Sequence, residues 1–151
     1  MATVDQIILV FNRLQANLEQ LINNTIEETK NSLTDDIKAQ LYAGTDATGN
    51  KITPRYRNVR YAKKKAFLNP RPGLFTPDLK LTGALYKGLF ALVYEENLLF
   101  SSNVDYAGLL EKKYGIKIFE PNRSNLNDYI TGKFRPALFH KIEVQTGLSF
   151  Q

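Results

Sequence analysis

Side chains that could act as nucleophiles, general bases or metal ligands are few in this chain. It has no cysteine and one histidine, His140, so cysteine nucleophiles, thiolate zinc sites, iron–sulfur clusters and histidine-rich metal sites are excluded. His140 lies in an apolar run, residues 138–142, that is typical of a helix. We therefore interpret it as a surface or helix-packing residue and not as a general base.

Carboxylates and glycines offer no better catalytic arrangement. Neighbouring residues on a helix point about 100° apart, so adjacent acids in the first 43 residues cannot converge on one ligand. The segment 44–51, with Gly44 and Gly49, lacks the Lys-Ser/Thr that must follow the second glycine of a phosphate-binding loop. The sequence predicts no enzyme, no cofactor and no metal site. The acidic pairs behind this prediction are Glu27 with Glu28, Asp35 with Asp36, and Glu95 with Glu96.

The clearest binding signal is a basic segment interleaved with tyrosines. Residues 51–80 hold nine bases and one acid, a net charge of +8 in a chain whose formal charge is +5. Cations beside aromatic rings suit phosphates and stacked bases, but basic segments also dock on acidic protein surfaces. We expect protein docking ahead of sequence-specific nucleic-acid recognition, with nonspecific DNA contact as the alternative. The candidate partner-binding residues are Arg55, Tyr56, Arg57, Arg60, Tyr61, Lys63, Lys64 and Lys65.

The length and composition indicate one globular domain over residues 1–151. With 43% hydrophobic residues, the chain has enough apolar surface to bury without disulfides. Its longest apolar runs are much shorter than the roughly 20 residues that span a bilayer, so no membrane segment is expected. The N-terminus also lacks the pattern of a signal peptide, which predicts a cytoplasmic location where the protein is made.

Periodicity predicts an α+β fold: a small antiparallel sheet packed by a long N-terminal amphipathic helix, or a helix pair, and by a C-terminal helix. Residues 1–43 are helical, because apolar residues recur every three or four positions from Ile7 to Leu21 and beyond. Residues 81–121 form a hairpin, a short helix ending at Gly115, and a strand at residues 116–119. Residues 122–151 form a helix perturbed by Gly132 and Pro136.

Residues 44–80 are expected to form a long basic loop. Glycines and prolines interrupt every window, although a short helical turn near residues 59–67 fits the pattern. Because the segment repels itself electrostatically, we expect it to be mobile in the free protein and to become ordered on assembly, with Tyr56, Tyr61 and Phe67 as apolar anchors.

Three motifs occur in order along the chain. A glycine-and-aspartate turn, Gly44-Thr-Asp46-Ala-Thr-Gly49, is followed by Pro54. Residues 79–85 then read Leu-Lys-Leu-Thr-Gly-Ala-Leu, and residues 106–115 read Tyr-Ala-Gly-Leu-Leu-Glu-Lys-Lys-Tyr-Gly. Together with the amphipathic N-terminal helix, they resemble the tail-completion, or virion-morphogenesis, proteins of tailed bacteriophages over roughly residues 4 to 121.

The resemblance implies a noncatalytic structural protein of a virion. Such a protein completes the tail end or the neck and joins head and tail through contacts with a connector or a tail terminator. It implies several copies, arranged as a homo-oligomeric ring in the virion, and a location in the host cytoplasm only during assembly. The alternative is a small nonspecific nucleic-acid-binding protein that uses residues 51–65.

Overall fold

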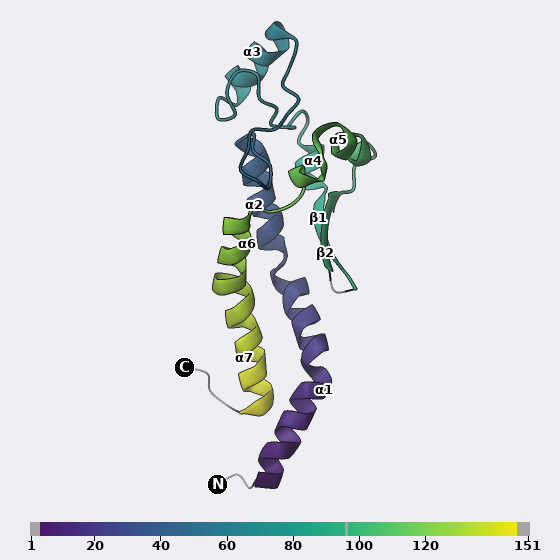
Figure 1. Ribbon diagram of the computed structural model, residues 1–151, viewed down its shortest axis with the longest axis vertical. Helices are drawn as coiled ribbons and strands as arrows, with labels where there is room; N and C mark the ends of the chain where they lie inside the picture. Colours follow the sequence, from purple (N-terminus) through teal and green to yellow (C-terminus); the bar gives the residue numbers. More distant parts are fainter. Residues whose placement is uncertain (1–3, 96, 148–151) are drawn as a thin grey trace. The chain divides into compact units, whose positions relative to one another are not determined.

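The computed structural model describes residues 4–95 and 97–147. Over these residues the fold is α+β, as the sequence predicts, with a long N-terminal helix, a two-stranded antiparallel hairpin and a 24-residue C-terminal helix (Figure 1). The described residues divide into two compact units, one of residues 4–30 and 128–147 and one of residues 31–127 without residue 96. Each unit is described by itself, and the single domain expected over residues 1–151 stays a prediction.

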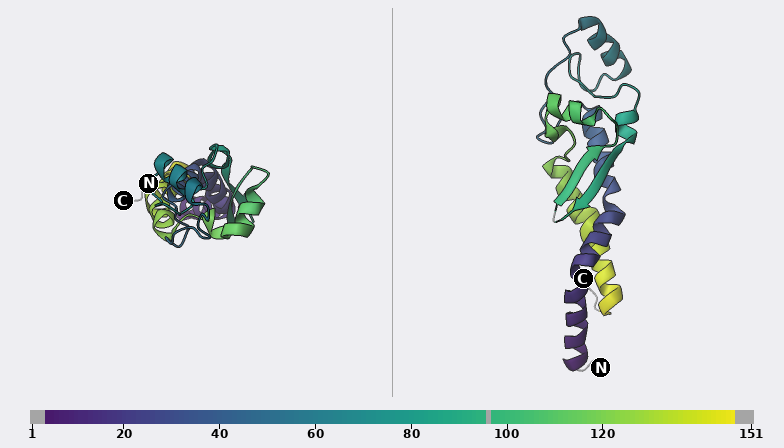
Figure 2. Two further views of the ribbon diagram at one scale, coloured as in Figure 1. Left: turned by 90° about the horizontal axis from the view of Figure 1, so that it is seen from above. Right: turned by 90° about the vertical axis from the view of Figure 1, so that its right-hand side faces the viewer.

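The first unit is a pair of antiparallel helices. Helix α1 (Val4–Thr29) packs against α7 (Arg135–Thr146), and the two run side by side in both side views (Figures 1 and 2). The Thr29 and Tyr129 hydroxyls lie 2.8 Å apart, and Lys141 pairs with Glu28 at 2.6 Å. These polar contacts and the burial of Leu21 fix the C-terminal half of α1 against its partner.

The C-terminal helix changes its winding where the sequence predicts a perturbation. Helix α6 (Arg123–Tyr129) passes into a π-helical turn, η2 (Ile130–Phe134), which contains Gly132, and then into α7. Proline has no N–H, so Pro136, the second residue of α7, cannot continue the α-helical hydrogen bonds. The π turn precedes it directly, and the Arg135 N–H bonds to the Ile130 carbonyl five residues back.

The second unit is built around one apolar core. Helix α2 (Asn31–Tyr42) packs against strand β1 (Leu89–Tyr94), which pairs antiparallel with β2 (Asn97–Ser102). Two short helices flank the hairpin along the chain: α4 (Ala84–Lys87) precedes β1, and α5 (Ala107–Tyr114) follows β2. Buried Gln40 ties α2 to the chain before α6, because its side chain bonds to Glu120 O and to Asn122 N. The core residues are Ile37, Leu41, Ile52, Leu85, Leu89, Ala107, Ile118 and Phe119.

Residues 44–80 are more structured than the long basic loop expected from the sequence. Helix α3 (Val59–Leu68) occupies ten of them, and an isolated bridge joins Thr45 to Lys51. Ile52 enters the core, and Thr76, Pro77 and Asp78 are buried. Helix α3 confirms the short helical turn that the pattern allowed near residues 59–67, so the segment is not a loop there. Its buried residues argue against the mobility expected in the free protein. The glycines and prolines of residues 44–80 did not reveal this structure, because its buried contacts join residues that are far apart in the segment.

The strand expected at residues 116–119 is also wrong. These residues form a 3-10 turn, η1 (Ile116–Ile118), in which Ile118 N bonds to Gly115 O and Phe119 N to Ile116 O. A strand turns successive side chains to opposite faces. Here the neighbours Ile118 and Phe119 are both fully buried in the same core, which the tighter turn allows.

We predict that two glycines with the same backbone handedness tolerate alanine very differently. Gly44 (φ 71°) and Gly49 (φ 80°) both lie in the left-handed region, where a side chain costs about 1–2 kcal/mol. A Cβ on Gly44 would also stand 2.6 Å from the Cβ of buried Pro72, whereas one on Gly49 meets nothing within 4 Å. In urea unfolding, Gly44→Ala should lose a further ~1–3 kcal/mol of stability relative to Gly49→Ala. Equal losses would contradict the close approach.

Candidate functional site

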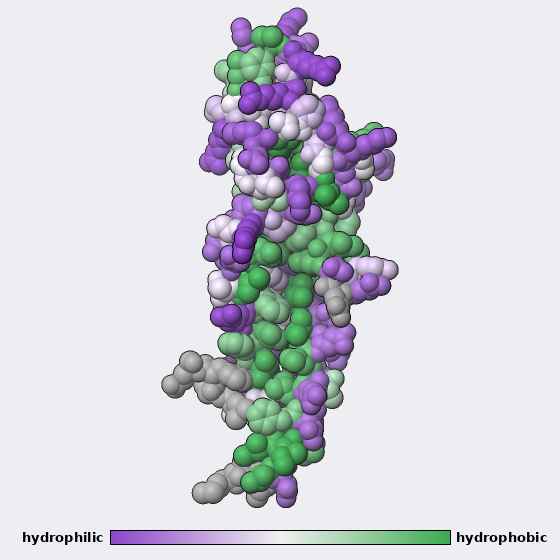
Figure 3. Space-filling view, in the orientation of Figure 1, coloured by the Kyte–Doolittle hydropathy of each residue, from purple (hydrophilic) through white to green (hydrophobic). Residues whose placement is uncertain are grey.

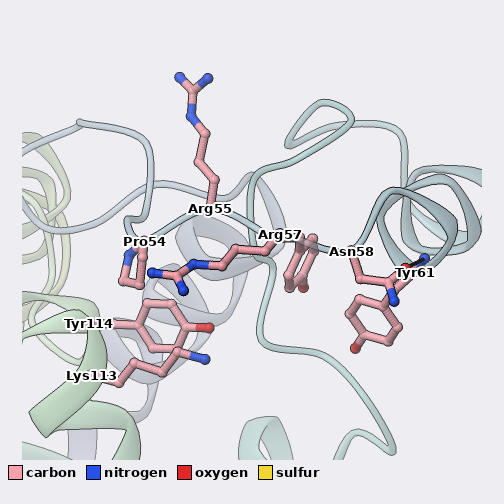
Figure 4. A pocket seen from close by; sticks show the side chains of 8 residues that line it. Pro54, Arg55, Arg57, Asn58, Tyr61, Lys113 and Tyr114 are labelled. Atoms are coloured by element: carbon pink, nitrogen blue, oxygen red, sulfur yellow. Dashed lines mark hydrogen bonds between the residues drawn. The ribbon is translucent and has the colours of Figure 1, made fainter.

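The basic residues frame two adjoining hollows in the second unit. The larger, of about 410 Å³, lies between residues 54–58, helix α3 and the end of α5 (Figure 4). The smaller, of about 400 Å³, shares Asn58 and Tyr61 with it. We call the two hollows together the cationic cleft. Its lining residues are Pro54, Arg55, Tyr56, Arg57, Asn58, Arg60, Tyr61, Lys64, Lys113 and Tyr114.

Local hydrogen bonds hold the aromatic wall of the cleft. Asn58 begins α3 as its N-cap, with its Oδ1 accepting from Tyr61 N at 2.9 Å, so Tyr61 is fixed at the first turn. Tyr56 is anchored by its own N–H, which donates to Phe75 O at 2.8 Å. The two tyrosine rings then meet edge to face, with their centroids 5.0 Å apart.

Charged side chains surround the two tyrosine rings of the cleft. In Figure 4, Arg57 reaches toward Pro54 and Tyr114, while Arg55 points away from them. Lys113 lies with its Nζ 5.0 Å from the centre of the Tyr114 ring. Among the described residues that line the cleft there is no Asp or Glu, so the cations face the solvent without a carboxylate beside them.

Lys65 does not belong to this surface, although the sequence placed it there. Its side chain is 9% exposed and forms an ion pair with Asp78 at 2.6 Å, and its Nζ also donates to Lys80 O at 2.5 Å. The Asp78 carboxylate accepts further bonds from Asn69 Nδ2 and Lys80 N, both at 3.1 Å. Lys65 is therefore a buried structural residue, and its partner-binding role was wrong.

The other candidate residues divide into three groups. Arg55, Arg57, Arg60, Tyr61 and Lys64 are exposed and line the cleft, as a docking role requires. Tyr56 lines it too but is half-buried, so it serves mainly as a wall. Lys63 is exposed on α3 but does not line either hollow.

Sequence reasoning missed the contribution of α5. Lys113 and Tyr114 come from the helix that ends at Gly115, about fifty residues away along the chain, and complete the far wall of the larger hollow. The signal was present, because Lys112-Lys113-Tyr114 repeats the mixture of cations and tyrosine found at residues 55–65. Only the fold brings the two basic clusters together.

Burial beside a negative charge raises the pKa of two tyrosines near the cleft. For Tyr56, desolvation is the larger cause and the Asp78 charge the second. For Tyr86, the causes are the same in the same order, and its hydroxyl donates to Asp78 O at 2.5 Å. Both phenols therefore stay neutral donors throughout the physiological range and carry no acid–base function there.

This arrangement suits the binding of anions. Guanidinium groups bind carboxylates and phosphates with paired hydrogen bonds, and tyrosine faces add apolar contact.

No group of three or more His, Cys, Asp or Glu among the described residues could hold a metal ion. His140 is exposed on α7, in the first unit, whereas the cleft belongs to the second. No helix within residues 4–147 as described is long and apolar enough to cross a bilayer.

Comparison with known proteins adds no relative to this description. No protein-family model, curated protein or solved structure matches the chain.

We predict that the buried ion pair stabilises the cleft-bearing segment. Asp78→Asn keeps the shape but leaves the Lys65 ammonium buried without its counter-charge, and breaking such a pair costs roughly 3–5 kcal/mol. The matched control is Asp35→Asn, which breaks the exposed Lys38–Asp35 pair and should cost at most about 1 kcal/mol. Urea unfolding measures both losses, and limited proteolysis should cut residues 51–76 faster in Asp78→Asn than in the wild type. Similar stability of the two variants would contradict the role of the pair.

We also predict that stability falls at alkaline pH because of Tyr86. Its folded pKa is raised above the unfolded value of about 10, so the neutral phenol stabilises the fold below that pH. This contribution is lost as the pH rises above it, because the unfolded chain releases the proton first. Urea unfolding between about pH 8 and about pH 11 should show a smaller loss for Tyr86→Phe than for the wild type. An unchanged loss would mean that Tyr86 does not cause it.

Proposed function

We propose that this chain is a noncatalytic structural subunit of a tailed-phage virion that completes the tail end or neck and joins head to tail. It acts through protein–protein contacts, in several copies, with a connector or a tail terminator as neighbour. The cationic cleft is the surface that meets the neighbour, and its cations call for an anionic counterpart. The resemblance of the ordered motifs to tail-completion proteins suggests this class of protein, and the packing of the motifs in the fold supports it.

The observation that carries the proposal is that all three motifs meet in one core. The glycine-and-aspartate turn leads directly to buried Ile52, the Thr-Gly motif contributes Leu85, and the Tyr-Ala motif contributes Ala107. Leu79 packs against the same core from its edge. Motifs that share a core form parts of one structural unit, and this supports the proposal that they act together as one scaffold.

The first two motifs also have a physical role in that scaffold. Asp46 Oδ1 accepts from Thr48 N and Asn50 N, which closes the turn, and Ile52 N then bonds to Gly44 O. Gly83 (φ 86°) provides the left-handed residue before α4, and Ser102 Oγ of β2 donates to Leu85 O at 3.0 Å. These are scaffold functions, which agrees with a subunit that works by shape and charge.

One feature favours a second candidate, a nonspecific nucleic-acid-binding protein that uses residues 51–65. The cleft combines arginines with tyrosine faces, the pattern that binds phosphates and stacks bases. An electrophoretic shift of short duplex or single-stranded DNA at physiological salt would favour this candidate. Binding that vanishes at that salt would favour a protein neighbour instead.

The joining role is tested by complementation. The gene is deleted from the genome that carries it and is supplied again as wild type or as the triple variant Arg57→Glu, Arg60→Glu, Lys64→Glu. Without the gene, electron micrographs should show separate heads and tails, or tails with unfinished ends. The triple variant should give the same particles, because it reverses the charge of the cleft.

The matched control reverses the charge of three exposed residues outside the cleft, so its net charge equals that of the first triple variant. Its substitutions are Arg123→Glu, Lys133→Glu and Arg135→Glu. It should restore joined particles. Both triple variants should unfold at nearly the wild-type urea concentration, since exposed charges contribute little to stability. Normal particles from the deletion would refute the joining role, and equal failure of the two variants would show that the cleft is not the contact surface.

A further inference from the structure

The N-terminal half of α1 carries a heptad pattern that the described residues of its own unit leave largely exposed. Apolar residues alternate at spacings of three and four, which defines the a and d positions of a coiled-coil seam. The a positions are Val4, Phe11 and Leu18, and the d positions are Ile7, Leu14 and Leu21. This spacing, kept over three successive a/d pairs, is the pattern by which one helix packs lengthwise on another.

Exposure along this seam is high at its N-terminal end, where Ile7 is 45% exposed, and lower toward its C-terminal end, where Leu14 is already half-buried. Val4 is 71% exposed and Phe11 53%, whereas Leu18 is 37% and Leu21 only 7% exposed. In both side views the first turns of α1 extend past the end of α7 (Figures 1 and 2). Helix α7 therefore covers the C-terminal part of the seam and, among the described residues, leaves the N-terminal part open.

The open part is a concentrated apolar surface. Besides the seam residues, Ile8 and Leu9 are about half exposed, and Figure 3 shows apolar side chains gathered over this end of α1. Monomeric proteins rarely leave so many neighbouring large apolar side chains in water unless they mark an interaction site. The surface needs an occupant.

The charge pattern of the open part is compatible with a second copy of the same helix. Over residues 4–18 the positions that flank the seam, e and g, carry no charge; they hold Ile8, Val10, Gln15 and Asn17. Charged residues at e and g are what direct a helix to a different partner or repel a copy of itself. Asp5 and Arg13, the charged residues in this stretch, lie at b and c on the outer side. A second copy of the same helix therefore meets this seam without like-charge repulsion.

The same charges argue against a lipid surface. A helix that lies on a membrane has a polar face rich in lysine and arginine. Helix α1 has four acids, Asp5, Glu19, Glu27 and Glu28, against one base, Arg13, so an anionic headgroup surface would repel it.

We infer that the N-terminal seam of α1, residues 4–18, is a self-association surface at which α1 packs against α1 of a second copy of this chain. The contact is apolar, and it is independent of the cationic cleft. It does not depend on the virion role, because the purified protein should associate in the same way in the absence of any other component. Failure of the contact and failure of the joining role therefore give different results.

The test is sedimentation of the purified full chain from low to several hundred micromolar. The wild type should change from monomer to oligomer, and Ile7→Ser with Phe11→Ser should remain a monomer at every concentration. The matched control is Leu81→Ser with Leu109→Ser, which replaces two residues that are 78% and 69% exposed outside the seam and should behave as the wild type. Circular dichroism and urea unfolding confirm that both variants keep the fold.

A cysteine crosslink locates the contact. The chain has no cysteine, and Phe11 lies at the midpoint of residues 4–18, so two copies bring their residues 11 together in a parallel or an antiparallel packing. Phe11→Cys should form a disulfide-linked dimer rapidly under mild oxidation, whereas Arg13→Cys, on the outer side, should not. Three outcomes would overturn the inference. The wild type could stay monomeric, the double seam variant could associate as well as the wild type, or the two cysteine variants could crosslink equally. A monomer that instead floats with phosphatidylcholine vesicles would identify lipid as the occupant and overturn it too.

Discussion

The ion pair between Lys65 and Asp78 is the constraint that gives the segment before the hairpin its structure. A buried charge pair is tolerated only when further hydrogen bonds satisfy its remaining donors and acceptors. Here Lys80 supplies both a carbonyl and an N–H, and Asn69 bridges Asp78 to Tyr42 O at the end of α2. Satisfying one pair thus requires α2, α3 and the chain before α4 to meet. The cleft depends on this meeting, because the same helix α3 that buries Lys65 presents Arg60, Tyr61 and Lys64 to the solvent.

The elements that could be predicted from the sequence are those whose signal is local. The apolar spacing predicted helix over residues 1–43, as one helix or a pair, and the structure has the pair α1 and α2. The hairpin was predicted from two apolar runs around a polar turn. The perturbation of the last helix followed from Pro136, since a missing N–H acts within one turn. In each case the residues that determine the structure lie within a few positions of it.

The features that could not be predicted depend on residues far apart in sequence. Lys64 and Lys65 are chemically identical neighbours, yet one is exposed in the cleft and the other is buried against Asp78. Successive helix positions differ by about 100° in direction, so only the position of Asp78 decides which lysine is turned inward. The same limit applies to the far wall of the cleft, because Lys113 and Tyr114 reach it through the packing of α5 and not through proximity along the chain.

The two surfaces of this protein use different physical forces, and an assembling subunit benefits from that difference. At the contact that we propose, the cationic cleft would attract an anionic neighbour through charge, which acts at a distance and weakens as salt screens it. The α1 seam is apolar, so its contribution acts only on contact and is little affected by screening. The seam lies in one unit and the cleft in the other, so the α1–α1 contact that we propose uses none of the residues that line the cleft. Copies that associate as we propose would offer several clefts at once, and weak contacts made together bind far more tightly than any of them alone.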